Sequence, residues 1–179
     1  MGSRNDVPRL VTDRLVLRAH ATDDFAACAA MWSQPQVVRH IGGMPSKPQQ
    51  SWSRMLTYAG LWRFLGYGYW AIVERDGGAF VGDAGFADFK REMTPSIAGL
   101  PEAGWVLAPA MQGKGYASEA VAAMLAWADE HIDAERSVCI VDPDHRASVR
   151  VAEKNGYREI AQADYHGPVT LFARDRPAP

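Results

Sequence analysis

The sequence from Pro101 to Ala120 reads PEAGWVLAPAMQGKGYASEA, and it predicts a strand, a Gly-rich turn and a helix in that order. The strand is the apolar run 105–107, which a proline stops two residues later. Gly113 and Gly115 give the backbone freedom around the start of a helix expected over 112–132. Because the first turn of a helix has unpaired N–H groups, and glycines let an anion approach them, this arrangement predicts a pyrophosphate site.

Three phosphate-binding patterns could account for these glycines. A P-loop needs Gly at the position of Ala108 and Ser or Thr at the position of Gly115. A dinucleotide-binding fingerprint needs a third glycine where Ser118 stands, although Asp133 lies near the expected acidic spacing. The third pattern, Gln/Arg-x-x-Gly-x-Gly/Ala, is matched by Gln112, Gly115 and Ala117.

This third pattern resembles the coenzyme A pyrophosphate loop of the GNAT superfamily of N-acetyltransferases. Four further segments resemble the RimJ/RimL-type branch and occur in its order: TDRLVLR (12–18), QPQVVR (34–39), EAGWVL (102–107) and DPDHRASVRVAEKNGY (142–157). The resemblance covers about 10–174. It implies an α/β (α+β) fold with a mixed, mostly antiparallel central sheet, helices on both faces, and a splayed parallel pair of strands at the acetyl-CoA site.

The resemblance also implies which residues bind acetyl-CoA. The pantetheine arm would pair with the backbone of Trp105, Val106 and Leu107. The pyrophosphate would lie on Gln112, Gly113, Lys114, Gly115, Tyr116 and Ala117. His145 stands where the branch usually has an asparagine that positions the pantetheine or the acceptor, and Ser148 lies on the helix that follows. His145 could instead only cap that helix, and the sequence leaves both roles open.

Acetyl transfer to an amine needs a held donor, a neutral amine and release of a thiolate. Glu102 occupies the Glu of the branch's Glu-x-Gly-Tyr/Trp-x-Leu pattern and is the candidate base; the alternative is a solvated carboxylate at the start of a strand. Many relatives place a tyrosine acid on the helix after the fifth strand, but Ala152 has that position here. A thiol with a pKa of about 8.5 needs only ~2 kcal/mol of help at pH 7, which Ser148 or a bound water could supply.

Composition limits the other function classes. The 179 residues are 47% hydrophobic, which predicts one domain over 10–174 with flexible termini at 1–9 and 175–179. The net charge of -2 without a basic stripe gives no support for nucleic-acid or membrane binding. Cys28 and Cys139 lack metal-site spacing and are expected to be buried, so no metal is predicted. No signal peptide or transmembrane run is evident, which favours the cytoplasm.

Hydrophobic periodicity and turn residues predict the remaining elements. We expect a strand at 10–18, helices after 22 and after 46, a hairpin of 69–74 with 80–89, a loop at 90–100, a strand at 136–142, a helix at 147–154 capped by Asn155-Gly156, and an antiparallel pair at 157–162 and 169–174. Gly82 and Gly85 predict a bulge or a close ligand approach. The stripe Trp52, Met55, Leu56, Ala59 and Trp62 is expected to pack in the core. Trp32, Trp52 and Trp62 could also partly line the acceptor site.

The hypothesis is an acetyl-CoA-dependent N-acetyltransferase that acts by direct attack of a primary amine, in the manner the RimJ/RimL resemblance implies. The expected acceptor is a peptide N-terminal α-amine. A small amine such as a polyamine, an aminoglycoside or an amino-acid derivative is the alternative acceptor, and a non-catalytic acyl-CoA-binding module is the alternative class. The sequence leaves monomer and homodimer open.

Overall fold

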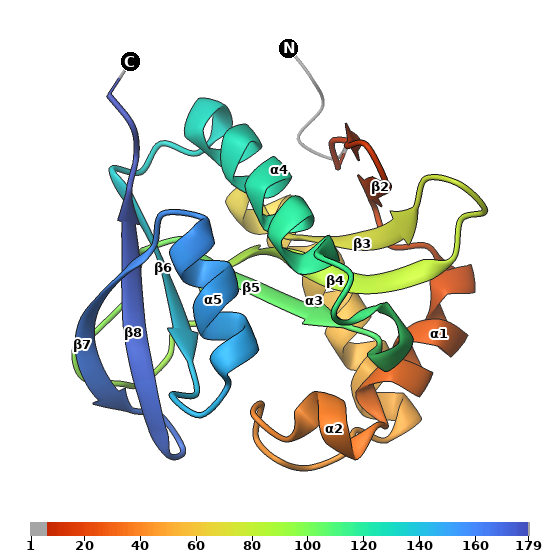
Figure 1. Ribbon diagram of the computed structural model, residues 1–179, viewed down its shortest axis with the longest axis horizontal. Helices are drawn as coiled ribbons and strands as arrows, with labels where there is room; N and C mark the ends of the chain where they lie inside the picture. Colours follow the sequence, from red (N-terminus) through yellow and green to blue (C-terminus); the bar gives the residue numbers. More distant parts are fainter. Residues whose placement is uncertain (1–6, 179) are drawn as a thin grey trace.

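A computed structural model describes residues 7–178, and an eight-stranded sheet with the order β1-β2-β3-β4-β5-β6-β8-β7 forms its centre (Figure 1). The strands are β1 (Leu10–Val11), β2 (Leu15–Arg18), β3 (Tyr69–Glu74), β4 (Phe80–Ala87), β5 (Glu102–Leu107), β6 (Arg136–Val141), β7 (Arg158–Asp164) and β8 (Pro168–Asp175). The α-helices are α1 (Phe25–Trp32), α2 (Pro35–Val38), α3 (Pro48–Leu65), α4 (Tyr116–His131) and α5 (Arg146–Lys154). Short 3-10 turns at Thr22–Asp24 and Pro109–Met111 precede α1 and the loop before α4.

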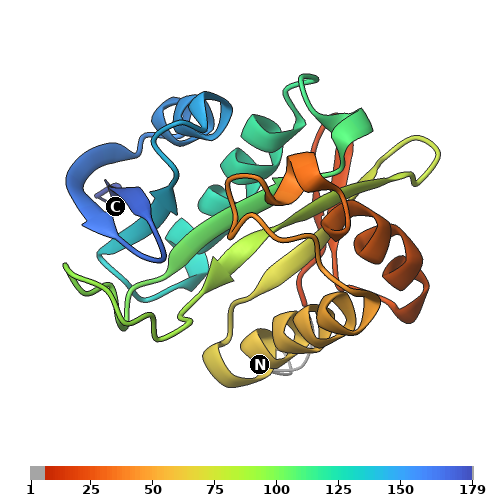
Figure 2. The same cartoon turned by 90° about the horizontal axis from the view of Figure 1, so that it is seen from below.

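Helices cover both faces of the sheet. Figure 2 shows α1 and α3 on one side and α4 and α5 on the other. Side chains alternate between these faces, so Phe86 packs with Val121 and Met124 of α4, whereas Val106 packs against Cys28 and other buried residues of α1, α2 and α3. The core is therefore divided by the sheet into two layers, and this mixed α/β architecture confirms the predicted fold class.

β5 and β6 are the parallel neighbours, and they separate almost at once. Their register has one Cα pair, Glu102 with Val138, beside a 3.0 Å hydrogen bond from Val138 N to Pro101 O. β4 and β5, by contrast, have six consecutive pairs. We call the opening between 103–107 of β5 and 139–141 of β6 the fork. The predicted splayed pair is confirmed.

Several local predictions hold for identifiable reasons. The hairpin β3–β4 turns where the sequence has Asp76-Gly77, and α5 ends before Gly156, whose φ of 85° is the left-handed conformation that a helix terminus uses. The β3–β4 register shifts between Ile72 and Val73, opposite Gly82, so the predicted bulge is present. A Cβ on Gly82 would lie 2.1 Å from Val106 O. The close approach at this glycine is therefore to the protein's own backbone.

Two predicted boundaries were wrong. The single strand expected at 10–18 is a tight antiparallel pair, β1 and β2, because Thr12 Oγ1 accepts a 2.9 Å hydrogen bond from Leu15 N and turns the chain. The helix expected from Gln112 begins only at Tyr116. The intervening Gly113 and Gly115 have φ values of 76° and 81°, which are incompatible with a right-handed helix.

The predicted core face of α3 was also wrong in part. Met55 and Trp62 are buried, but Trp52, Leu56 and Ala59 are exposed, and the buried side is completed by Ser51 and Tyr58. The spacing 51, 55, 58, 62 satisfies helical periodicity as well as the expected stripe does, and apolar side chains occur on both sides of this helix. Trp32 is 4% exposed and belongs to the core.

The ends of the described chain make contacts of their own. Trp70 Nε1 donates a 2.7 Å hydrogen bond to Pro8 O, and Arg176 N donates one of 2.8 Å to Glu135 O. The flexible termini predicted at 1–9 and 175–179 fall partly outside the described residues, at 1–6 and 179. Among the helices of residues 7–178, none is long and apolar enough to cross a membrane.

Candidate active site

The Gly-rich loop between β5 and α4 has an open surface. Gly115 occupies the N-cap of α4 in the left-handed conformation, and Gly113 also has a positive φ angle. A Cβ on Gly113 would meet no heavy atom within 4 Å. The first-turn N–H groups of α4 have no partner within their own helix, and such groups can bind an anion. The predicted glycines therefore leave the loop before α4 exposed, with no heavy atom close to Gly113 on its Cβ side.

Arg14 holds this loop in place, and sequence reasoning did not assign it that role. Its Nη1 donates a 2.9 Å hydrogen bond to Lys114 O, its Nε donates one of 2.7 Å to Glu119, and its guanidinium lies 4.7 Å from the centre of the Tyr116 ring. Partial burial alone would raise the pKa of Glu119, but hydrogen bonds from Thr12 and Arg14 hold that pKa below its usual value. The available signal was the position of Arg14 in the segment 12–18.

The other loop side chains are engaged with the protein. Gln112 Nε2 donates a 3.0 Å hydrogen bond to Leu107 O, which ties the loop to the end of β5. The Tyr116 hydroxyl donates one of 2.7 Å to Glu74. Lys114 Nζ lies 3.6 Å from Met111 Sδ. A ligand on this loop would therefore meet mainly backbone N–H groups, together with the end of an exposed lysine.

The β5 wall of the fork is formed by 105–107. Trp105 packs against the core on the α4 side, Val106 packs against the α1–α2 side, and Leu107 is buried. Because these side chains go to the two faces, the edge of β5 that points toward β6 presents backbone. Beyond Glu102 that edge has no pairing with β6, so it can accept an extended ligand.

The opposite wall is the turn between β6 and α5. His145 is the N-cap residue of α5, but its side chain makes no capping hydrogen bond, so the simple capping interpretation is wrong. Its ring instead stacks on His40 at 4.5 Å and 10°, and His40 Nδ1 lies 2.7 Å from Asp142 Oδ2. We call His40, Asp142 and His145 the clasp, because they join the segment after α2 to the turn after β6. Ser148 is half-buried in the first turn of α5, and within residues 7–178 its hydroxyl has no hydrogen-bond partner.

Glu102 lies at the vertex of the fork and is 5% exposed. Its two oxygens accept hydrogen bonds from Arg91 Nε and Nη2 at 2.7 and 2.9 Å. The Arg91 guanidinium lies between the rings of Phe89 and Tyr165, at 4.9 and 4.6 Å from their centres. The interpretation of Glu102 as a solvated carboxylate is therefore wrong. A carboxylate has about four lone-pair positions, so Arg91 leaves about two that could accept a proton.

The comparisons with known proteins agree with this geometry. Residues 14–158 match the family model described as an acetyltransferase (GNAT) domain. The chain belongs to the GNAT acetyltransferase family. It is 29% identical over 154 residues to the uncharacterized N-acetyltransferase YoaA of Bacillus subtilis, covering 85% of this chain and 84% of that protein. A solved structure described as a GnaT-family acetyltransferase from Bordetella pertussis has 30% identity and a TM-score of 0.82, covering 94% and 99% of the two chains.

A third GNAT comparison concerns the fold alone. The solved structure of RimL, a ribosomal L7/L12 alpha-N-protein acetyltransferase in complex with coenzyme A, is 18% identical to this chain. It has a TM-score of 0.75 and covers 94% of this chain and 98% of its own. The family match extends over the loop, both walls of the fork and the clasp, and it ends where β7 begins.

Three further kinds of group in this GNAT chain, namely an acid at position 152, a reactive thiol and a metal site, are not offered by the described residues. Ala152 is fully buried in the main core and has no polar group, so it supplies no acid. Cys28 and Cys139 are free and buried, as predicted, and burial raises the pKa of each thiol well above its usual value. Within residues 7–178, no three His, Cys, Asp or Glu side chains converge as metal ligands.

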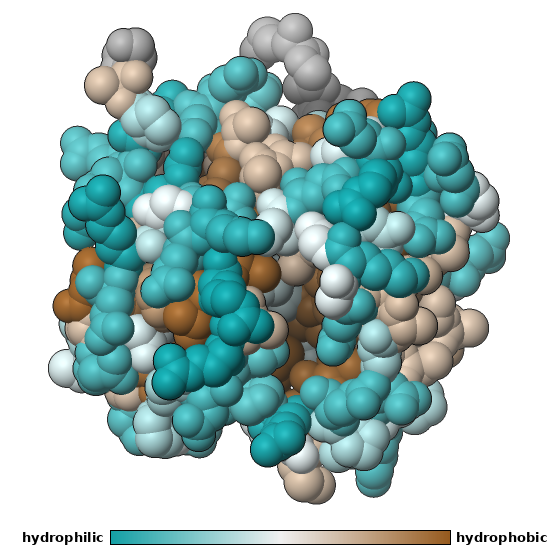
Figure 3. Space-filling model, in the orientation of Figure 1, coloured by the Kyte–Doolittle hydropathy of each residue, from teal (hydrophilic) through white to brown (hydrophobic). Residues whose placement is uncertain are grey.

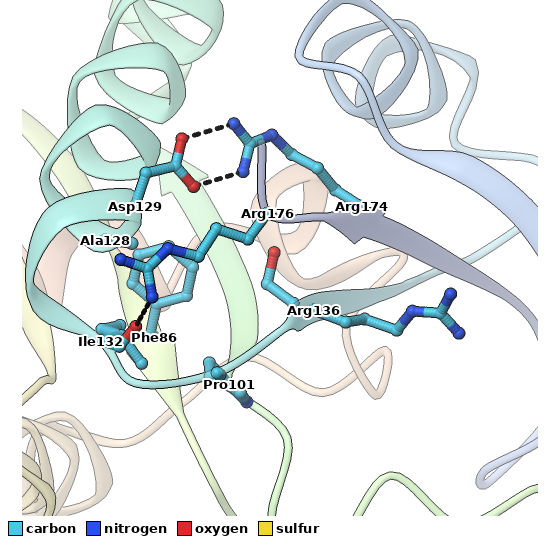
Figure 4. Close-up of a pocket in the computed structure, with 10 residues that line it drawn as sticks. Phe86, Pro101, Ala128, Asp129, Ile132, Arg136, Arg174 and Arg176 are labelled. Atoms are coloured by element: carbon cyan, nitrogen blue, oxygen red, sulfur yellow. Dashed lines mark hydrogen bonds and ion pairs between the residues drawn. The ribbon is translucent and has the colours of Figure 1, made fainter. Parts of the chain in front are cut away.

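A shallow pocket at the other end of β6 lies apart from this GNAT site. Its volume is about 20 Å³. In Figure 4, Arg174 points both guanidinium nitrogens at Asp129, and Arg136 points away from the other labelled side chains. The two Arg174–Asp129 hydrogen bonds are 2.7 Å long, and Arg176 Nη1 lies 3.3 Å from Ile132 O. The arginines are thus used within the protein. The space-filling view shows a hollow with apolar residues near the centre of the face that carries α4 and α5 (Figure 3).

The clasp should make stability depend on pH. Burial, and then the neighbouring His40, hold the pKa of His145 below its ordinary 6.5, although Asp142 opposes this. The unfolded chain therefore protonates this ring at higher pH than the folded protein, and stability falls as pH drops through 6.5 toward the folded pKa. We expect His145→Asn to lack this loss of stability. The difference between its Tm and the Tm of the wild type should therefore shift in favour of the variant as pH falls from about 7.5 to about 5.5. Circular dichroism melts would measure the gap; a gap constant with pH would contradict the expectation.

Proposed function

We propose that this acetyltransferase moves an acetyl group from acetyl-CoA to a primary amine by direct attack within a ternary complex. One observation carries the proposal. β5 and β6 are parallel and diverge after Glu102 and Val138, so their carboxyl ends lie at the same edge of the sheet. The Gly-rich loop follows one strand and the first turn of α5 follows the other. An extended donor can thus lie in the fork while its phosphates reach the loop.

The residues present fit acetyl-CoA as the co-substrate, which supplies the thioester. Gly113, Lys114, Gly115, Tyr116 and Ala117 would bind the pyrophosphate chiefly through backbone N–H groups. The unpaired edge of 105–107 would bind the pantetheine arm. His145 and Ser148, on the opposite wall, would hold it from the other side. Coenzyme A in the RimL structure, which has the same fold, supports this choice of donor.

Glu102 is the proposed base, directly or through a water, because it lies at the vertex of the fork with lone pairs that Arg91 does not use. Ser148, whose hydroxyl has no hydrogen-bond partner within residues 7–178, is the proposed donor of a hydrogen bond to the leaving thiolate. It would take the place of the tyrosine acid that many relatives have at the position of Ala152. A thiolate needs little help at neutral pH, so a weak donor suffices.

A peptide α-amine is the proposed acceptor. At pH 7 an α-amine with a pKa near 8 costs roughly 1.4 kcal/mol to deprotonate, whereas a lysine amine near 10.4 costs about 4.6 kcal/mol. A site with one candidate carboxylate base is better suited to the α-amine, which costs less free energy to deprotonate. Several proteins of the same fold are described as ribosomal-protein acetyltransferases, which supports the same acceptor class.

We therefore expect α-amine acetylation to exceed lysine acetylation in a peptide that has a free N-terminus and one internal lysine. Mass spectrometry of the singly acetylated product would locate the acetyl group. Polyamines and aminoglycosides would be tested in parallel, with thiol release from acetyl-CoA as the common readout. Dominant lysine product, or turnover of only the small amines, would contradict the peptide acceptor. Binding of acetyl-CoA without thiol release for any amine would contradict catalysis itself.

A further inference from the structure

Tyr69, Gly85 and Gly104 form one lateral row across β3, β4 and β5, on the face that α1 and α3 cover. A Cβ on Gly85 would lie 2.4 Å from Tyr69 Cα, and a Cβ on Gly104 would lie 2.0 Å from the Tyr69 hydroxyl oxygen. The tyrosine side chain therefore lies flat across β4, and its hydroxyl stands directly over Gly104. Both glycines are needed for this path, since any side chain at either position would block it.

The ring of Tyr69 is held rigidly. It stacks on Tyr58 of α3 at 4.3 Å and 3°, and only 6% of the residue is exposed. Burial, and then the negative charge of Glu102, raise the pKa of Tyr69 well above its usual value. The hydroxyl is thus neutral at physiological pH, and it can both donate and accept a hydrogen bond.

Within residues 7–178, no hydrogen-bond partner is found for this hydroxyl. Ser51 Oγ is the one fully enclosed side-chain oxygen or nitrogen in residues 7–178 without a hydrogen bond. Tyr69 Oη also makes none within these residues, so it retains access to the space outside. A largely buried hydroxyl costs free energy unless something bonds to it. A water or a ligand on the open side can supply that hydrogen bond.

The position of the hydroxyl relates it to the proposed chemistry. Glu102 is two residues before Gly104 in β5, so its side chain lies on the same face of the sheet as the Tyr69 side chain, which crosses Gly104. Both Glu102 oxygens already accept hydrogen bonds from Arg91. The Tyr69 hydroxyl therefore supplies a second polar atom near the candidate base, and the described part of the chain gives it no hydrogen-bond partner.

We propose that the Tyr69 hydroxyl binds the acceptor at the fork by accepting a hydrogen bond from an N–H of the attacking amine. This inference rests on the proposed function and adds a specificity-determining residue to it. The neutral hydroxyl orients the amine while the nitrogen lone pair stays available for the thioester carbon. The proton that leaves the nitrogen passes to Glu102 or its water, so Tyr69 undergoes no change of charge.

The test compares Tyr69→Phe with the wild type on whichever amine the wild type acetylates fastest. Loss of one such hydrogen bond should raise KM for the amine about 3- to 10-fold, with KM for acetyl-CoA unchanged. Tyr157→Phe is the matched control, because it removes a hydroxyl that is bonded to Ser137 elsewhere in the fold, and it should leave both KM values unchanged. Gly104→Ala, which places a methyl group where the hydroxyl lies, should raise the amine KM at least as much.

Each outcome is decisive. An amine KM within about twofold of the wild type in a folded Tyr69→Phe protein would overturn the inference and leave the proposed function standing. Equal increases in both KM values would assign Tyr69 to structure only. Absence of wild-type turnover with every amine would remove the proposed function, and the inference with it.

Discussion

Gly115→Asp should raise the Kd for acetyl-CoA about 100-fold while the protein remains folded. The substitution puts a negative charge beside the N–H groups of the first turn of α4, where the pyrophosphate is proposed to bind. Weakening one or two hydrogen bonds to a charged group costs about 2.7 kcal/mol, which corresponds to the stated factor. Only Arg14 Nη2 would be near the new Cβ, at 3.4 Å, so the side chain has room.

Backbone strain must be separated from charge in this experiment. Gly77, in the β3–β4 turn, has a φ of 91°, and a Cβ added there would have no heavy atom within 4 Å, so Gly77→Asp has the same kind of strain away from the loop. Isothermal calorimetry of both variants, with Gly115→Ala as the uncharged partner, would measure the affinities. Equal affinity in Gly115→Asp and the wild type would remove the loop from the binding site.

Glu102→Gln should lower kcat on the order of 100-fold at pH 7, and part of the loss should be recovered at higher pH. Glutamine keeps the size and one acceptor oxygen for Arg91 but cannot take a proton. About one tenth of α-amines with a pKa near 8 are neutral at pH 7, and about nine tenths are neutral at pH 9. The gap between variant and wild type should therefore narrow by up to about tenfold over this range.

Arg91→Gln is the control for the structural part of that effect. It removes the partner of Glu102 and keeps the carboxylate, so it should lower the Tm because a buried charge has lost its hydrogen bonds. Rates measured between about pH 6.5 and about pH 9 would separate the two roles, because the neutral fraction of an α-amine changes most over this interval. A loss in Glu102→Gln that is independent of pH, and matched by Arg91→Gln, would assign Glu102 to support of the fork.

The sequence predicted those features of the fold that depend on a few neighbouring residues. The loop around Gly113 and Gly115, the turn at Gly77 and the cap at Gly156 depend on backbone conformations that glycine alone adopts readily, so their positions are visible in the chain itself. The fork was predicted through family resemblance, because no periodicity in β5 or β6 shows that two strands will diverge.

The contacts that complete the site were not predictable in this way. Arg14 and Lys114 meet across the fold, as do His40 and Asp142, and each pairing depends on the three-dimensional arrangement of separate elements. The face of α3 was misassigned because large apolar or aromatic side chains occur at helical spacing on both sides of this helix. The position of the Tyr69 hydroxyl over Gly104 needs two glycines in neighbouring strands, which only the register reveals.

The single pair of residues that links β5 to β6 also makes the sheet mechanically discontinuous. Backbone hydrogen bonding carries almost no cohesion from the β1–β5 part to the β6–β8 part, so side chains must do so. They are the hydrophobic core that both parts share with α4, the Arg174–Asp129 pair from β8 to α4, and the clasp at the opposite end of β6. A donor lying in the fork would act as a missing strand between the two parts. Under the proposed function, the co-substrate would thus be a structural component of the folded enzyme, whose resistance to unfolding would rise with its concentration.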